Sequence, residues 1–234
     1  MDFRIISIGC LAAHPLWNER GAVRTGHATT TLITSGKRRI LVDPGLPPQA
    51  LSARLSERTG ISPQDVTDVF LTSFAPDVRR GLALFDGATW HISETEREVV
   101  GVNLATALKD LVTRSESQGG VAKDESLREV LEHDVALLAK CKPAPDSLAD
   151  RVDLFPLPGV SPGMCGLLLS HTRHTALICG DAIPTSEHIE QGKSPSPVPD
   201  LAAAKSSFEE ALEIADLLIL GRDNIVVNPT KRPF

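Results

Sequence analysis

The sequence lacks three features that would mark a specialised class of protein: a long apolar run, closely spaced cysteine pairs and an excess of basic charge. A helix that crosses a membrane needs about 20 consecutive apolar residues, and no run in this chain approaches that length. The apolar stretch at 3–10 is too short for a signal peptide and is typical of a first strand. We therefore expect a soluble, cytoplasmic protein that does not associate with membranes.

The four cysteines do not form the C-x-x-C spacing that is typical of zinc or redox sites. Cys165 and Cys179 lie in apolar stretches that are typical of strands. We interpret them, together with Cys10 and Cys141, as reduced thiols of an intracellular protein. A metal or redox site built from cysteine is not expected.

The formal net charge of -6 argues against nucleic-acid binding, because the phosphate backbone requires a basic surface. The sequence also lacks a G-x-S-x-G motif, a glycine-rich phosphate loop and a Ser-His-Asp order. Ser73 lies near Asp77 but has no evident histidine base, so we do not expect a nucleophilic serine.

Hydrophobic patterning predicts strands and helices in alternation through the first half of the chain. β-Branched residues are concentrated at 28–34, as strands favour, and Gly36 marks a hairpin turn. The predicted strands are 3–8, 28–34, 39–42, 66–72 and 89–92, and the predicted helices are 48–58, a short turn at 62–65, 94–111 and 125–140. The polar, glycine-rich segment 115–120 is predicted to connect the last two helices.

The second half repeats the order of the first. Its predicted elements are strands at 151–156, 163–170, 175–179 and 216–220, a proline-rich loop at 194–199 and a helix at 201–215. Two such halves are expected to form two sheets packed face to face with helices outside. A chain of 234 residues fits one large α/β domain or two small ones. We predict one domain over 1–234, with a helical insertion at about 94–150.

Five motifs follow one another in the order found in a known superfamily. They are ILVDPG at 40–45, LTSFAPDVRRG at 71–81, LPGVSPG at 157–163, ALICGD at 176–181 and LILGRD at 218–223. Together they resemble the landmarks of the metallo-β-lactamase superfamily over nearly the whole chain. The resemblance implies an α/β (α+β) fold, a four-layer αββα sandwich of two mixed sheets flanked by helices.

The resemblance also implies where the family binds two divalent metal ions. Its seven ligand positions fall on Ser73, Ala75, Asp77, Val78, Val160, Asp181 and Arg222. Only the two aspartates are good ligands, because alanine and valine have no lone pair and a serine hydroxyl binds zinc poorly. An arginine stays protonated and repels a cation. A zinc-activated water needs about three protein ligands, so we expect no metal and no other cofactor.

Arg222 offers a way for the fold to persist without metals. Two partly desolvated aspartates facing each other would destabilise the fold. Our hypothesis is that the Arg222 guanidinium occupies the vacated volume and pairs with Asp181 and Asp77, because its fork suits two carboxylates. The alternative is a surface arginine at a loop end. The resemblance places Asp43 beside the cavity as a support for a metal ligand, although closing the turn before Pro44 explains it equally well.

A second set of residues suggests a ligand pocket near the N-terminus. His14, Trp17, Arg24 and His27 lie in a long segment after the first strand, a region that in the family often overhangs the mouth of the site. They could form aromatic and cationic walls; the alternative is a structural loop with a packed tryptophan. The remaining histidines singled out, His133 and the pair His171 and His174, are interpreted as exposed.

These observations favour a metallo-β-lactamase-fold pseudoenzyme that acts by binding a small molecule or a protein. The first alternative is a metal-dependent hydrolase of an ester, lactone, thioester or phosphoester, with a relocated or weak metal site that uses Asp77, Asp181 and His14 or His27. The second is a structural subunit that forms a homodimer or pairs with an active relative. Fold alone does not decide among them.

Overall fold

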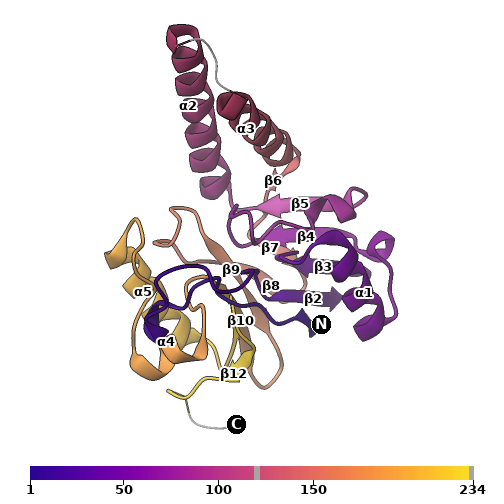
Figure 1. Ribbon diagram of the computed structural model, residues 1–234. Coiled ribbons are helices and arrows are strands. Elements are labelled where there is room, and N and C mark those ends of the chain that lie inside the picture. Colours follow the sequence, from indigo (N-terminus) through magenta and orange to yellow (C-terminus); the bar gives the residue numbers. More distant parts are fainter. Residues whose placement is uncertain (119–121, 232–234) are drawn as a thin grey trace.

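The computed structural model describes residues 1–118 and 122–231 and contains two six-stranded sheets that pack face to face (Figure 1). The first sheet has the spatial order β1 (Asp2–Ser7), β2 (Thr30–Ser35), β3 (Arg38–Val42), β4 (Asp68–Leu71), β5 (Thr89–Ile92) and β6 (Lys142–Pro143). The second has the order β12 (Ile225–Val227), β11 (Leu217–Leu220), β10 (Thr175–Gly180), β9 (Cys165–Ser170), β8 (Val152–Pro156) and β7 (Ser147–Ala149).

Both sheets are mixed. In the first, β1, β2 and β3 pair antiparallel, and β3 to β6 pair parallel. In the second, β10 and β11 form a parallel pair within an otherwise antiparallel sheet. The predicted fold class, with two mixed sheets flanked by helices, is therefore confirmed.

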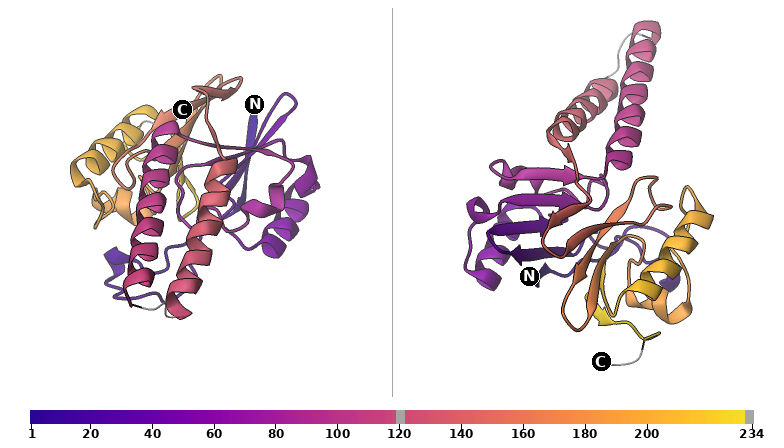
Figure 2. Two further views of the ribbon diagram at one scale, coloured as in Figure 1. Left: turned by 90° about the horizontal axis from the view of Figure 1, so that it is seen from above. Right: turned by 180° about the vertical axis from the view of Figure 1, so that it is seen from behind.

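The helices cover the two outer faces and form one projection. They are α1 (Pro48–Thr59), α2 (Glu94–Gln118), α3 (Ala122–Lys140), α4 (Ser186–Gln191) and α5 (Leu201–Ile214), with 3₁₀ turns at Pro15–Trp17, Pro63–Asp65 and Leu82–Phe85. In Figures 1 and 2, α1 lies outside the first sheet and α5 outside the second, while α2 and α3 project away from the sandwich side by side.

Alternation along the strands creates three apolar layers. Ile40 and Val42 belong to the core between the sheets, whereas Leu41, between them in sequence, packs toward α1. In the second sheet, Ile178 faces the same central core and Leu177 packs toward α5. Successive strand residues point to opposite faces, so an apolar run in a central strand supplies both layers.

Several predicted boundaries were wrong. The helix predicted to end at residue 111 continues to Gln118, so residues 115–118 are helical and not a connector, and residues 119 and 120 lie outside the described part. The following helix begins at Ala122 rather than at 125. The strands β6, β7 and β12 and the helix α4 were not predicted, because each is only two to six residues long and shows little periodicity.

No helix in the described ranges, 1–118 and 122–231, is long and apolar enough to cross a membrane.

Candidate functional site

The second sheet presents Asp181 and Arg222 side by side. Asp181 follows β10, and Arg222 follows the residue after β11, which is the parallel neighbour of β10. The carboxyl ends of parallel strands meet at one edge of a sheet. A side chain at Gly221 would place a Cβ 2.3 Å from the carbonyl oxygen of Gly180, so the two loops touch backbone to backbone. The glycine thus lets the two charged residues start from adjacent positions.

The first sheet contributes Asp77 from the loop after β4. The backbone carbonyl of Asp77 accepts a hydrogen bond from the Ala28 amide at 3.1 Å, and the neighbouring Thr29 amide donates to the Gly221 carbonyl at 2.8 Å. Residues 28 and 29 therefore connect the Asp77 loop to the loop that carries Arg222. The site lies where loops of both sheets meet.

The guanidinium of Arg222 bridges the two carboxylates. Its Nε donates to Asp181 Oδ1 at 2.7 Å and its Nη2 donates to Asp181 Oδ2 at 2.6 Å. Its Nη1 donates to Asp77 Oδ2, and Nη2 also approaches Asp77 Oδ1 at 3.3 Å. The contact with Asp181 is the paired fork geometry that arginine makes best with a carboxylate.

Arg222 is buried, with only 4% of its side chain exposed, and it stays charged. Burial disfavours the charge, but the attraction and hydrogen bonds of Asp181 and then Asp77 outweigh it and raise the pKa of the guanidinium above its usual value. Asp77 and Asp181 are more open, with 34% and 19% of their side chains exposed. The arginine therefore lies beneath the carboxylates.

This set of residues does not fit a divalent metal centre. The Arg222 guanidinium, itself a cation, bonds to both Asp77 and Asp181 from the position between them, so a metal ion could not be held by both carboxylates there and would find no third ligand among the described residues. No group of three or more His, Cys, Asp or Glu residues within the described part of the chain could hold a metal ion.

Asp43 supports the floor of the site from β3. Its carboxylate accepts hydrogen bonds from the Thr72 amide and the Thr72 hydroxyl, both at 2.8 Å. These bonds join the end of β3 to the end of β4, from which the Asp77 loop departs. Burial raises the pKa of Asp43 to about 7, with the Thr72 hydrogen bonds opposing and the nearby charge of Asp181 adding to the shift. Asp43 also adopts a left-handed backbone conformation, with φ of 52°, which is consistent with its role at the turn.

The other four positions that correspond to family ligands are distributed differently. Val160 lines the cavity above Asp77 and Asp181. Val78 is 1% exposed and belongs to the apolar core under α1, and Ala75 packs against the same core. Ser73 is buried. These positions now serve packing and present no lone pairs to a cation, apart from the serine hydroxyl.

Asp77, Asp181 and Arg222 line a cavity of about 430 Å³, and we call these three residues its floor. The N-terminal segment, including Leu11, Ala12 and Ala13, and the loop that contains Pro197 and Val198 also line the cavity, and we call them its walls. Apart from Glu19, which pairs with Arg24, the charged side chains of the lining belong to the floor.

The four residues predicted to form a pocket near the N-terminus are not in the wall of this cavity, although their segment is. His14 is buried, stacks on Trp17 with ring centroids 4.1 Å apart, and approaches Thr185 Oγ1 at 3.1 Å through Nε2. Arg24 pairs with Glu19. His27 approaches Cys10 Sγ at 3.5 Å and lines a different cavity, against α1. These four side chains therefore anchor the N-terminal segment, and other residues of that segment line the Asp77 cavity.

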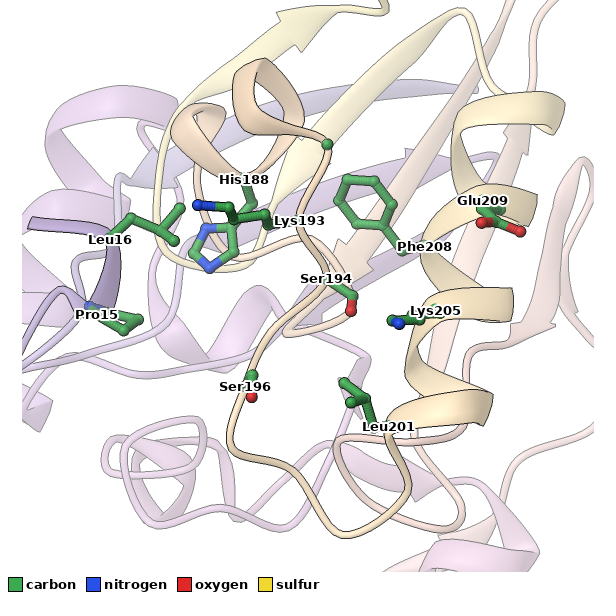
Figure 3. A pocket seen from close by; sticks show the side chains of 11 residues that line it. Pro15, Leu16, His188, Lys193, Ser194, Ser196, Leu201, Lys205, Phe208 and Glu209 are labelled. Atoms are coloured by element: carbon green, nitrogen blue, oxygen red, sulfur yellow. The ribbon is translucent and has the colours of Figure 1, made fainter.

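His188 is a site residue that sequence reasoning missed. It is 1% exposed, its Nδ1 lies 2.9 Å from Thr185 Oγ1, and it lines both the Asp77 cavity and a second cavity of about 540 Å³. Figure 3 shows this second cavity, with Lys193 beside His188 and with Lys205 and Phe208 projecting from α5. Burial and the proximity of His14 lower the pKa of His188, so it is neutral near neutral pH. The signal in the sequence that could have placed His188 at the site was its position, seven residues after Asp181.

The other three histidines that the sequence analysis interpreted as exposed behave in two ways. His133 is exposed, as predicted. His171 and His174 lie in the turn between β9 and β10 as predicted, but both are only partly exposed, because their rings stack with centroids 4.5 Å apart and Phe3 packs edge-on against His171.

Solved structures with the same architecture include hydrolases. A metallo-β-lactamase candidate from Thermotoga maritima is 22% identical, with a TM-score of 0.66 over 97% of this chain and 98% of that chain. AidC, a dizinc quorum-quenching lactonase in complex with the product N-hexanoyl-L-homoserine, is 21% identical, with a TM-score of 0.58 over 80% of this chain and 67% of that chain. A quorum-quenching N-acyl homoserine lactone lactonase is 18% identical, with a TM-score of 0.62 over 94% and 90%. At these identities the likeness is one of fold.

Sequence comparison identifies the family directly. No curated protein sequence matches the chain. The sequence profile of the metallo-beta-lactamase superfamily matches residues 23–220, a range that includes the first four motifs, the start of the fifth, and strands β2 to β11. The chain therefore belongs to the metallo-β-lactamase superfamily.

Proposed function

We propose that this chain is a non-catalytic member of its superfamily, which binds a small molecule or a protein in the Asp77 cavity and uses no metal. The observation that carries the proposal is the contact of the Arg222 guanidinium with both Asp77 and Asp181. A buried guanidinium neutralises one unit of negative charge permanently, so the two carboxylates no longer require a cation.

The chemistry left at the site supports binding rather than hydrolysis. Hydrolysis by a zinc-bound water needs a Lewis acid with an open coordination position. Arginine can stabilise charge but cannot lower the pKa of a bound water in that way. The alternative nucleophile, Ser73, is buried, and no histidine bonds to its hydroxyl among the residues that the structure describes. A cavity with apolar walls and a polar floor remains suited to holding a ligand.

The test is the metal content of the protein, measured by elemental mass spectrometry. The protein is purified without chelators or a histidine tag, dialysed against zinc or manganese and then against metal-free buffer. We expect less than about a tenth of an equivalent of any transition metal, because two carboxylates already paired with arginine form a poor site. One equivalent that is lost in Asp77→Asn would contradict the proposal.

The matched variant is Arg222→His. It removes the guanidinium and leaves two carboxylates and an imidazole, which are three ligands of the kinds that zinc prefers. We expect this variant to retain zinc that the wild type does not, which would assign the loss of metal binding to Arg222.

A hydrolase with a relocated or weak metal site is the second candidate, because the dizinc lactonase AidC has a similar fold. It requires a metal equivalent in the wild-type protein and hydrolysis of an ester, lactone, thioester or phosphoester that depends on that metal. The same elemental measurement therefore separates the two candidates.

A further inference from the structure

The charges around the Asp77 cavity sum to a negative value. Three carboxylates, from Glu19, Asp77 and Asp181, and one guanidinium, from Arg222, line it. Glu19 is paired with Arg24, which leaves two carboxylates against one guanidinium on the floor. A centre holding two dications would present the opposite sign to a ligand.

The floor also presents acceptors rather than donors. Arg222 directs Nε, Nη1 and Nη2 at the carboxylates and is almost fully buried. The carboxylates of Asp77 and Asp181 are partly exposed, and each oxygen retains a lone pair beyond its bond to Arg222. A ligand that reaches the floor therefore meets oxygen atoms that accept hydrogen bonds.

The apolar side chains of the walls favour a ligand with an apolar hydrocarbon part. Leu11, Val160, Pro184 and Val198 contribute aliphatic surface above the charged floor. His188, on the same wall, is neutral because burial lowers its pKa, so it adds no positive charge that would attract an anion. The volume of about 430 Å³ holds a group of small-metabolite size.

We propose that the Asp77 cavity binds an organic cation, an ammonium group on an aliphatic body, with the ammonium donating to Asp77 and Asp181. The proposal deepens the proposed function and rests on it, because it requires Arg222 and not metal ions between the two carboxylates. Substitution of two dications by one guanidinium would thereby reverse the charge of the ligand that the pocket accepts.

Three probes test this inference: hexylammonium, hexanoate and hexanol. All three have a six-carbon chain, and they differ in the charge of the head group. The readout is the NMR methyl shifts of Val160 and Val198, which line this cavity and not the one in Figure 3. We expect hexylammonium to shift these methyls with an affinity about tenfold higher than that of hexanol, and the difference to shrink as salt screens the charges. Hexanoate should leave them unshifted. Methyl shifts caused by hexanoate as strongly as by hexylammonium, or no shift with hexylammonium near its solubility limit, would overturn the inference.

Two variants and one control locate the effect. Asp77→Asn removes a charge from a side chain that is one-third exposed and should weaken hexylammonium binding about tenfold. Val198→Lys adds a positive charge to the cavity and lies in a loop, so it should affect folding little. It should weaken hexylammonium binding to a similar extent, measured by the methyl shifts of Val160. Glu190→Gln removes a charge from an exposed position on α4 and should change nothing. Equal binding by all four proteins would contradict the inference.

Failure of this inference can be told from failure of the proposed function. If the metal content is negligible and hexanoate is the preferred probe, the pseudoenzyme stands and the ligand charge is wrong. If the protein carries a metal equivalent bound through Asp77, the proposed function fails first.

Discussion

At the scale of single residues, the site depends on the balance of three charges. Arg222 is buried beneath Asp77 and Asp181 and bonds to both. A guanidinium is fixed in place by the chain and carries one charge, whereas metal ions exchange with solvent and carry two each. The proposed metal-free function rests on this difference.

Arg222→Met should destabilise the protein by about 3 kcal/mol, because it leaves two partly desolvated carboxylates unpaired. This value is at the lower end of the destabilisation usually caused by removing one partner of a buried ion pair, because Asp77 is one-third exposed. Urea unfolding measures the change.

The control for that variant is Arg54→Met. Arg54 is exposed and, within residues 1–118 and 122–231, forms its ion pair with Glu57 on the same helix, so its removal should change stability by about 0.5 kcal/mol or less. Equal losses in the two variants would show that the Arg222 contacts contribute no more than a surface ion pair.

Asp43 should make stability depend on pH in the opposite sense to most carboxylates. Its pKa rises from an ordinary 3.8 to about 7 on folding, so between these values the folded protein holds a proton that the unfolded chain has released. The stability associated with that proton is fully present below pH 3.8 and is lost as pH rises to about 7.

Asp43→Asn tests this linkage. An amide can still accept from the Thr72 amide and can donate to the Thr72 hydroxyl, while carrying no charge. Relative to wild type, the variant should gain stability as pH rises through this window, by up to about 4 kcal/mol. Urea unfolding of both proteins across the window measures the difference. A difference in stability that does not vary with pH across the window would contradict the linkage.

At the scale of elements, the site is an assembly of loops at the ends of strands β4, β10 and β11. Gly221 permits the backbone contact with Gly180 that places Arg222 next to Asp181. The bonds from Ala28 and Thr29 join these loops across the two sheets. Because each loop is short and held by backbone bonds, the backbone itself brings the three charged side chains together.

Gly221→Ala should therefore destabilise the protein by about 2 kcal/mol or more, since the new Cβ would lie 2.3 Å from the Gly180 carbonyl oxygen and must push the loops apart. Thermal unfolding measures the effect. Gly87→Ala is the matched control, because its Cβ would meet nothing within 4 Å, and it should be close to neutral. A neutral Gly221→Ala would mean that the loops separate freely.

The strands of the core could be predicted from the sequence because their apolar runs are long and β-branched, as at Thr30–Ser35. The hypothesised pairing of Arg222 with both aspartates agrees with the observed hydrogen bonds, because the motifs fixed which loops meet. His188 could not be predicted, since α4 has no apolar periodicity and the residue reaches the cavity through tertiary packing. The length of α2 was missed because its last turn is polar and loop-like in composition.

At the scale of the whole molecule, the chain has the αββα sandwich of its superfamily. The three apolar layers lie in the strands and in α1 and α5, and the site residues lie in loops at one edge of the sheets. The core packing thus depends mainly on the strands and helices, and the charged cluster of the site depends mainly on the loops. The cytoplasmic location, the single domain over 1–234 and the homodimer stay predictions, and the solution mass of the purified protein tests the last of them.

The most direct test of the account is a crystal structure of the protein soaked in excess zinc, with diffraction recorded at the zinc absorption edge. The account predicts guanidinium density between Asp77 and Asp181 and no anomalous peak there. An anomalous peak between the two carboxylates, with Arg222 displaced toward solvent, would contradict it.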